Sequence, residues 1–345
     1  MRVALLIYTP WMVKFGIVGF GLHAVKRLMP GFLAAKHCQV TALSRRTMEK
    51  AQASARQFNI TLAFDSVDAL CRSPEVDAVL VTTPNAMHLQ DVLSALRHSK
   101  HVLCEKPMGV NADECRQMVE AARKAGVLLG VAQVFRFEDS TRRLRERLAS
   151  GEIGKPIFAR AEFSFPGKTG HARQWLYDPA VAGGGPIADV GVHCIDGLRY
   201  ILQDEVVSVS ARGTHDEVSG KLEAASAMIL EFSKGTLATV QVSFRADYRT
   251  PLEIVGEHGA LRAENGFNVE HPVNIERRDV WEVLETETVS NAPAYTRQVD
   301  AFAQAIEGGA PFLVPGEQGW QNQEILDASY RSIKSGKNEP VPRRV

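Results

Sequence analysis

Short apolar runs rich in β-branched residues alternate with segments of helical periodicity in the first third of the chain. Four strands are predicted there, over residues 13–18, 40–44, 78–82 and 101–104. Such alternation with helices is typical of right-handed βαβ units, so it predicts a parallel sheet. The clearest helix is expected over 112–125, because Asn111 can cap it, Glu114 has capping-box spacing and Gly126 follows its last turn.

After residue 134 the pattern changes to β-rich stretches with few helices between them. These stretches cover residues 157–165, 206–212, 224–232 and 235–243. Strands without helical crossovers favour antiparallel pairing, so we expect a second, α+β domain with a large, open and mostly antiparallel sheet. The predicted domains of this α/β protein are 1–134 and 135–345. Residues 1–11 are expected to be a dispensable extension, because they carry no motif and Pro10 interrupts their apolar run.

Composition and charge narrow the class of protein. The chain has 345 residues, 45% of them hydrophobic, and 40 basic side chains balance 40 acidic ones. This balance argues against nucleic acid as the main partner, and no apolar run approaches the roughly 18 residues that span a bilayer. A cytoplasmic protein with no membrane partner is therefore expected. The five cysteines are odd in number and widely spaced, which indicates neither a disulfide framework nor a metal site.

The exit of the first predicted strand has the sequence VGFGLHA. Gly19, Gly21 and Ala24 match the pattern G-x-G-x-x-A between a strand and a helix, and the turn also includes Phe20 and Leu22. Backbone amides of such a turn, together with the helix N-terminus, bind a pyrophosphate. The alternative is an ordinary glycine-rich turn, but the flanking strand and helix favour a dinucleotide-binding Rossmann domain.

The end of the second predicted strand indicates which dinucleotide is bound. An acidic residue that binds the ribose is usual about 20 positions after the glycine motif, whereas this chain has Ser44, Arg45 and Arg46 there. A hydroxyl and two guanidinium groups suit a 2′-phosphate that a carboxylate would repel. NADP is therefore expected rather than NAD. The alternative is that the arginines only solvate a surface loop.

The stretch GGGPIADVGVHCID (183–196) places Asp189 and His193 four residues apart, on one face if the segment is helical. Two further motifs precede it, TTPNAMH (82–88) and CEKP (104–107). Together with the glycine turn, and in this order, these motifs resemble the Gfo/Idh/MocA family of NAD(P)-dependent oxidoreductases. The resemblance covers nearly the whole chain.

The resemblance implies that the active site lies in the crevice between a Rossmann domain and an open-sheet domain. It implies that Lys106 binds the reacting oxygen and that His193 donates or accepts the carbinol proton. Asp189 would bind a substrate hydroxyl or orient His193. Histidine suits this role because its unperturbed pKa of about 6.5 allows either protonation state near neutrality. The glycines at 183–185 would permit close approach to the nicotinamide and the substrate.

Other residues are expected around the cofactor and the substrate. The expected cofactor contacts are Thr83, Pro84, Asn85, His88, Glu105, Lys106, Gln133 and Arg136. For some of them a structural role is the alternative: Glu105 would brace its loop, and His88 would cap a helix. Gln133 and Arg136 would instead tie the two domains together. The expected substrate contacts are Lys106, Arg173, Trp175, Asp189 and His193; Arg173 and Trp175 share a polar loop with Lys168 and His171.

Asp189 and His193 could also be two metal ligands, with His171 or Cys194 as a third, but no complete ligand set accompanies them and no metal is expected. The expected activity is hydride transfer between NADP(H) and a carbonyl or secondary alcohol of a sugar, polyol or related cyclic diol. The alternatives are a non-catalytic dinucleotide-sensing regulator and an NAD-dependent enzyme that cleaves glycosides by transient oxidation. The open sheet is expected to pair in a homodimer or homotetramer.

Overall fold

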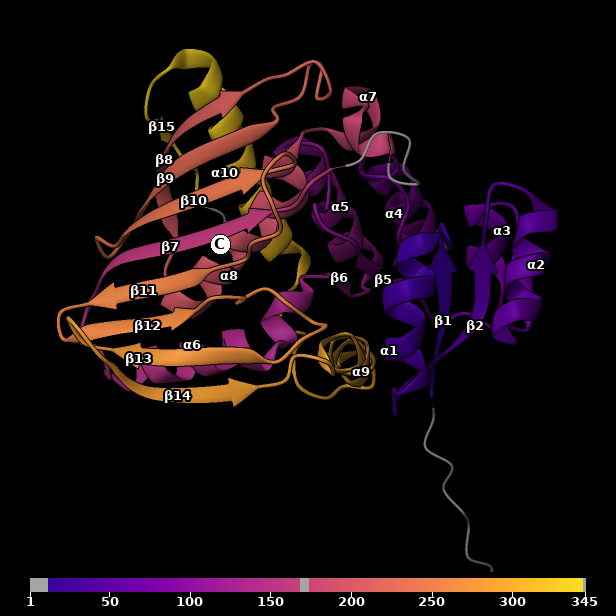
Figure 1. Cartoon of the computed structure of the whole chain (residues 1–345). Coiled ribbons are helices and arrows are strands. Elements are labelled where there is room, and N and C mark those ends of the chain that lie inside the picture. The colour runs from indigo at the N-terminus through magenta and orange to yellow at the C-terminus, as the bar shows by residue number, and fades with distance from the viewer. Residues whose placement is uncertain (1–11, 168–173, 344–345) are drawn as a thin grey trace, which may run out of the picture.

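The computed structural model describes residues 12–167 and 174–343, which form two domains around two sheets (Figure 1). The first sheet has six parallel strands in the order β3-β2-β1-β4-β5-β6. Its strands are β1 Val13–Val18, β2 Cys38–Ser44, β3 Leu62–Phe64, β4 Ala78–Val81, β5 His101–Cys104 and β6 Leu129–Val131. The order reverses between β1 and β4, the switch point at which such sheets bind ligands. The Rossmann domain expected from the sequence is confirmed.

The helices of the first domain begin and end at local signals. They are η1 Ala24–Leu28, α1 Met29–Leu33, α2 Met48–Phe58, α3 Val67–Arg72, η2 Asn85–Met87, α4 His88–Arg97 and α5 Ala112–Ala125. In α5 the Asn111 side chain accepts a hydrogen bond from the backbone N of Glu114, and Gly126 ends the helix in the left-handed region. The Glu114 carboxylate binds the backbone N of Val110, one residue earlier than in a standard capping box.

The second sheet has nine strands in the order β14-β13-β12-β11-β7-β10-β9-β8-β15, antiparallel except for the β7–β10 pair. The strands are β7 Pro156–Ser164, β8 Val206–Thr214, β9 Ala225–Phe232, β10 Leu237–Ser243, β11 Leu252–Gly256, β12 Gly259–Ala263, β13 Val273–Arg278, β14 Val283–Val289 and β15 Glu339–Pro340. Buried and exposed side chains alternate along β9 and β10, which leaves one face of the sheet to solvent. The large, mostly antiparallel sheet is confirmed.

Helices cover only the rear of this sheet in Figure 1, where α6 Asp139–Ala149, α8 Val192–Leu202 and α10 Gly316–Ser335 lie behind it. The remaining elements are η3 Val134–Phe137, η4 Gln174–Tyr177, α7 Pro179–Ala182, η5 Ile187–Gly191 and α9 Ala294–Ile306. No helix in the described part of the chain is both long and apolar enough to cross a membrane.

The C-terminal part of the chain returns to the first domain. The backbone N of Val131 in β6 donates to the Val314 carbonyl, and Gly130 forms a bridge with Pro315. Helix α10 packs on α5, and the Asp327 carboxylate accepts a hydrogen bond from the backbone N of Ala112. The two domains therefore share a packed boundary, whereas the division at residue 134 stays a prediction.

Candidate active site

The glycine turn lies at the carboxyl end of β1, beside the end of β4. Gly19 has a φ of +80°, and a Cβ on it would lie 2.9 Å from the backbone N of Thr83. Only glycine therefore fits between the two strand ends. A Cβ on Gly21 would make one ordinary contact, 3.5 Å from the Gly19 carbonyl oxygen, so no neighbouring helix or strand of the described chain packs against this residue. The turn has the form that lets backbone amides approach a phosphate group.

The predicted 2′-phosphate residues follow β2. Ser44 ends the strand and is buried, and its carbonyl accepts a hydrogen bond from the backbone N of Phe20 in the glycine turn. Arg45 donates from Nη1 to Ser54 Oγ on α2 at 2.8 Å, while Arg46 is exposed. The segment thus lies next to the glycine turn.

The polar side chains of the TPNAMH segment form hydrogen bonds with other loops and helices of the protein. Thr83 Oγ1 donates to Asp91, and the Asn85 amide donates to the Ala182 carbonyl at 2.8 Å. Pro84 precedes the short helix η2. His88 is fully buried, and its ring nitrogens face the Thr83 and Pro107 carbonyls at 2.8 and 3.0 Å. Burial lowers the pKa of His88, although both carbonyl contacts oppose this shift.

Glu105 and Lys106 at the end of β5 point to different partners, as strand alternation predicts. Glu105 Oε1 lies 2.8 Å from His23 Nε2, on the helix that follows the glycine turn. Burial alone would raise the pKa of Glu105, but His23 and Lys106 together lower it. Lys106 Nζ instead donates to the Asp189 carbonyl oxygen at 2.8 Å and to Asp189 Oδ1 at 3.1 Å.

Asp189 and His193 belong to one continuous helical segment, in which the π-helical turn η5 leads directly into α8. Such π turns often occur at functional sites. His193 is 7% exposed, and its buried Nδ1 has no hydrogen-bond partner in the described part of the chain. Its ring lies against Phe135, with centroids 4.4 Å apart, and stacks on Phe163 at 6.0 Å. The Asp189 carboxylate contacts Lys106, and no hydrogen bond joins it to His193 within the described residues.

The environment of His193 favours the neutral imidazole. Burial is the largest cause that lowers its pKa well below 6.5, and the nearby positive charge of Lys106 and the ring of His23 lower it further. A neutral imidazole can accept a proton. Next to it, a lysine held by Asp189 offers hydrogen-bond donors to an oxygen.

The glycines at 183–185 were expected to allow close approach of the nicotinamide and the substrate. In the structure, neighbouring parts of the protein leave no room for a side chain at these positions. A Cβ on Gly183 would lie 2.6 Å from Val110, one on Gly184 would lie 2.0 Å from Tyr330 Oη, and one on Gly185 would lie 2.5 Å from the Glu223 carbonyl. Each glycine is thus required by a neighbouring part of the protein. Their contacts fix the start of the helix that carries Asp189 and His193.

Gln133 and Arg136 follow β6 and have different surroundings. Gln133 is 1% exposed, and neither its amide nitrogen nor its amide oxygen has a partner among the described residues. A buried amide without partners is costly, so the side chain of Gln133 is a candidate to bind complementary groups. Arg136 is buried in a bidentate pair with Asp196 (2.7 and 2.8 Å) and also binds Gln318. Its contacts are therefore within the protein.

The substrate loop is described only in part. Arg173, with Lys168 and His171, lies outside the described residues. Trp175 is half-buried in η4. Elsewhere in the described chain, no group of three or more His, Cys, Asp or Glu side chains could hold a metal ion, and Cys194 is fully buried.

The sequence motifs did not mark several residues that shape this site. His23 lies within the glycine motif but was given no predicted role, and Glu223 lies in no motif. Phe135 and Phe163 come from η3 and β7, and an aromatic residue in a strand or turn is ordinarily part of a core. Only the tertiary contacts connect these residues with His193 and its helix.

Comparisons with known proteins agree with this geometry. A family model described as an oxidoreductase family with an NAD-binding Rossmann fold matches residues 13–133, and the GFO/IDH/MocA C-terminal domain matches residues 141–262. The 1,5-anhydro-D-fructose reductase of Ensifer adhaerens is 32% identical, over 89% of this chain and 92% of that protein. The D-xylose 1-dehydrogenase (NADP(+)) 2 of Haloferax volcanii is also 32% identical, over 94% and 98%.

Among solved structures, the aldose-aldose oxidoreductase from Caulobacter crescentus complexed with glycerol has a TM-score of 0.87 and 25% identity. The match covers 95% of this chain and 99% of that one. The two family models together cover most of the chain, in the order that the motifs predict. The chain therefore belongs to the Gfo/Idh/MocA family and is an NAD(P)-dependent oxidoreductase.

Proposed function

We propose that this enzyme transfers hydride between NADP(H) and a carbinol or carbonyl carbon of a sugar or polyol. The observation that carries the proposal is the contact of Lys106 Nζ with Asp189, on the same helical segment as the buried His193. A dinucleotide-sensing regulator needs no such set of proton-transferring groups. The sugar substrates named for the two similar relatives support the same class of substrate.

In the oxidative direction, the neutral His193 accepts the proton of the substrate hydroxyl as the oxygen becomes a carbonyl. Lys106 donates a hydrogen bond to this oxygen and stabilises its developing negative charge. Asp189 holds the lysine ammonium in place and is free to accept a bond from a second substrate hydroxyl. When bound, the nicotinamide accepts or gives the hydride. In reduction the same proton returns from His193 to the oxygen.

Two features of the described chain fit a dinucleotide. Gly21, against which no neighbouring helix or strand of this part of the chain packs, suits the approach of a pyrophosphate at the start of the helix. The two unpaired amide atoms of Gln133 complement the carboxamide of a nicotinamide, which also has one donor and one acceptor group. We assign pyrophosphate binding to the turn at residues 19–22 and nicotinamide binding to Gln133.

Ser44, Arg45 and Arg46 would bind the 2′-phosphate of NADP. Each charge-assisted hydrogen bond contributes about 1.5–3 kcal/mol, so NADPH should bind at least roughly tenfold more tightly than NADH. The double variant Ser44→Asp with Arg45→Ala should reverse this preference. Fluorescence titration of both cofactors measures it. Arg56→Ala, an exposed change on α2, is the control, and equal affinity of the parent enzyme for both cofactors would contradict the assignment.

The reaction itself is tested with substrates of the relatives. D-xylose with NADP⁺ and 1,5-anhydro-D-fructose with NADPH are compared with myo-inositol and NADP⁺, and absorbance of the reduced nicotinamide is followed. Turnover of at least one of the three is expected. A wider screen then covers aldoses, ketoses and diols. If the protein binds NADPH tightly but turns over no polyol or sugar, the result favours a dinucleotide-sensing regulator over an enzyme.

We also infer a homodimer or homotetramer in the cytoplasm, formed through the open face of the second sheet. Apolar side chains stand exposed on this face, including Phe158 (55%), Ile229 (53%) and Leu237 (42%). Beside them, Arg160, Glu253 and Arg262 face one another across β7, β11 and β12. A surface with both apolar groups and both signs of charge suits pairing with a second copy related by a twofold axis.

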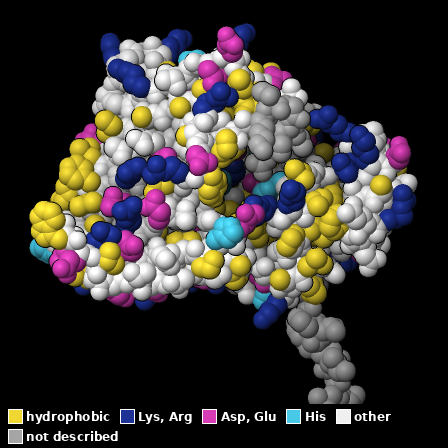
Figure 2. Space-filling model, in the orientation of Figure 1, with side chains coloured by type: hydrophobic (Ala, Val, Ile, Leu, Met, Phe, Trp, Pro, Cys, Tyr) yellow, Lys and Arg dark blue, Asp and Glu magenta, His cyan; other side chains and the backbone are white. Residues whose placement is uncertain are grey.

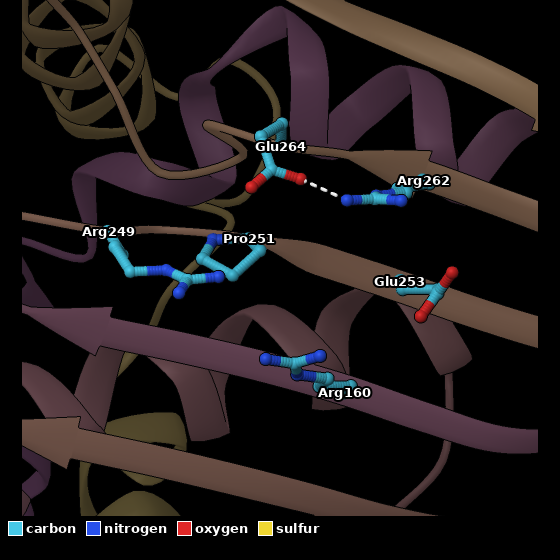
Figure 3. A pocket seen from close by; sticks show the side chains of 6 residues that line it. All are labelled: Arg160, Arg249, Pro251, Glu253, Arg262 and Glu264. Carbon is cyan, nitrogen blue, oxygen red and sulfur yellow. Dashed lines mark hydrogen bonds and ion pairs between the residues drawn. The ribbon is translucent and has the colours of Figure 1, made fainter.

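The charged part of this face forms a depression of about 90 Å³ (Figure 3). Arg160, Arg249, Pro251, Glu253, Arg262 and Glu264 line it, and Arg262 pairs with Glu264. Figure 2 shows basic and acidic side chains side by side on the same face. Their charges largely balance within the face, so the depression suits another charged protein surface better than a free anion.

Light scattering at micromolar concentration should give a mass of two or four times 37.9 kDa. Ile229→Glu places a carboxylate in the proposed contact and should shift the mass towards the monomer, because an unpaired charge is costly to bury. Leu33→Glu is the matched control, since Leu33 is 77% exposed on the first domain. A parent protein of 37.9 kDa alone would contradict the inference.

A further inference from the structure

A buried carboxylate outside every sequence motif holds the start of the helix that carries Asp189 and His193. Glu223 lies just before β9 and is 3% exposed. Its Oε1 accepts a hydrogen bond from the backbone N of Ile187 at 2.9 Å, and its Oε2 accepts one from the backbone N of Gly185 at 3.2 Å. Backbone N–H groups at the start of a helix have no partner within the helix.

This helix has no cap from its own sequence. Gly185 has no side chain, Pro186 has no N–H, and no side chain caps η5 locally. A negative charge at this end also interacts favourably with the helix dipole. Glu223 supplies the missing cap from 36 residues further along the chain.

Tyr330 on α10 fixes the orientation of this carboxylate. Its hydroxyl donates to Glu223 Oε1 at 3.1 Å and occupies the space next to Gly184. Burial raises the pKa of Glu223, while the bonds from Ile187, Tyr330 and Gly185 oppose that shift. The buried carboxylate is thus surrounded by its own hydrogen-bond donors, Gly185, Ile187 and Tyr330.

A line of hydrogen bonds continues from Glu223 to the catalytic groups. The Gly185 carbonyl accepts the backbone N–H of Asp189 at 3.0 Å. The Asp189 carbonyl and Oδ1 in turn accept from Lys106 Nζ. A displacement of the first turn of the helix would therefore be passed to the contact between Asp189 and Lys106.

We propose that Glu223 is a positioning residue: it caps the catalytic helix from a distance and so sets the place of Asp189 relative to Lys106. The kinetic consequence rests on the proposed function, because it requires Asp189 and Lys106 to act on a substrate. The capping contact itself does not require it. The two parts are therefore tested separately.

Hydrogen exchange tests the cap without any substrate. In Glu223→Gln, which keeps the volume of the side chain, the amide oxygen can accept only one of the two N–H bonds and the amide nitrogen faces the other. Amides of residues 185–189 should exchange at least about fivefold faster than in the parent, because a lost cap frays the first turn. Unchanged exchange there, or an equal increase in β1 and β5, would overturn the proposal.

Kinetics test the positioning role. Glu223→Gln and Glu223→Ala should lower kcat by about 10- to 100-fold, since small misplacement of reacting groups has effects of this size. The Kd of NADPH should stay within about twofold, and kcat is expressed per NADPH-binding site, so loss of folded protein does not contribute. Tyr330→Phe should have a smaller effect in the same direction, because it removes one bond to the carboxylate.

Two control variants separate positioning from charge and from stability. Glu231→Gln removes a β9 carboxylate that binds Ser208, and Ile275→Val removes a methyl group from the core at β13. Both should keep the parental kcat per site. If Glu223→Gln also keeps it while the parent turns over the sugars, the positioning role is refuted. If the parent turns over none, the proposed function fails and the exchange result alone decides whether Glu223 caps the helix.

Discussion

His193→Asn should lower kcat/KM for the best sugar substrate by about 10²- to 10⁴-fold, the usual contribution of a general acid or base. Asparagine fits the space between Phe135 and Phe163 but cannot take up the carbinol proton. The Kd of NADPH should change little, because the role proposed for this side chain is on the reacting oxygen of the substrate and not on the pyrophosphate or ribose of the cofactor. Steady-state rates and fluorescence titration, made in parallel, distinguish the two effects.

The pH dependence of kcat/KM for oxidation should also depend on His193. Because burial lowers the pKa of His193 well below 6.5, the free enzyme keeps a neutral base at pH 6.5 and above. The kcat/KM for oxidation should therefore fall only as pH decreases through that lowered pKa, where protonation removes the base. The residual activity of His193→Asn should lack this decrease.

His101→Asn is the matched control for this histidine. His101 begins β5, at the opposite end of the strand from Lys106, and burial lowers its pKa too. Its Nδ1 accepts a hydrogen bond from the backbone N of Leu128, and the side-chain oxygen of an asparagine can accept the same bond. This variant should keep the parental rate and pH profile. Near-normal turnover of His193→Asn would refute its role.

Lys106→Ala should lower kcat/KM by a similar factor of about 10²–10⁴, but for a different reason. It removes the donor to the reacting oxygen and leaves the Asp189 carboxylate, 14% exposed, without its cation. Asp189→Asn should cost less, because an amide still accepts a bond from the lysine and from a substrate hydroxyl. Measurements at saturating cofactor report on the substrate side alone.

Lys100→Ala is the matched control for Lys106. Lys100 precedes β5, at the opposite end of the strand from Lys106, and donates to the Ser73 and Val76 carbonyls. Any loss of activity in this variant should reflect stability and appear in the melting temperature. A Lys106→Ala enzyme with the parental kcat/KM would contradict the assignment of the reacting oxygen to this lysine.

The fold could be predicted closely wherever its signals are local. The bounds of β1, β5 and α5 are those expected, because a glycine turn, an alternating run and an Asn cap each act within a few residues. The helices α9 and α10 were not predicted. Their packing depends on the surfaces of α1 and α5, which precede them by some 200 residues or more in sequence.

The candidate site was predicted in part, through motifs that the family resemblance connected. Lys106 and Asp189 are 83 residues apart, and spacing alone could not have paired them. Motif reasoning left two roles open for Arg136, a cofactor contact or a tie between the domains. Its guanidinium pairs with Asp196 in the same helix as His193, a contact that no motif indicated. Glu223 could not be found at all, because a lone acidic residue before a strand carries no signal of what it will cap.

The contact of the C-terminal segment with β6 also affects how the protein folds during its synthesis. β6 is the last strand of the parallel sheet, and residues 314 and 315 bond to its free edge. During synthesis this edge stays unpaired until almost the entire chain has left the ribosome, and unpaired edges invite association with other chains. A fragment ending before residue 312 would keep the glycine turn but expose this edge permanently. The isolated nucleotide-binding half should therefore aggregate where the full chain does not.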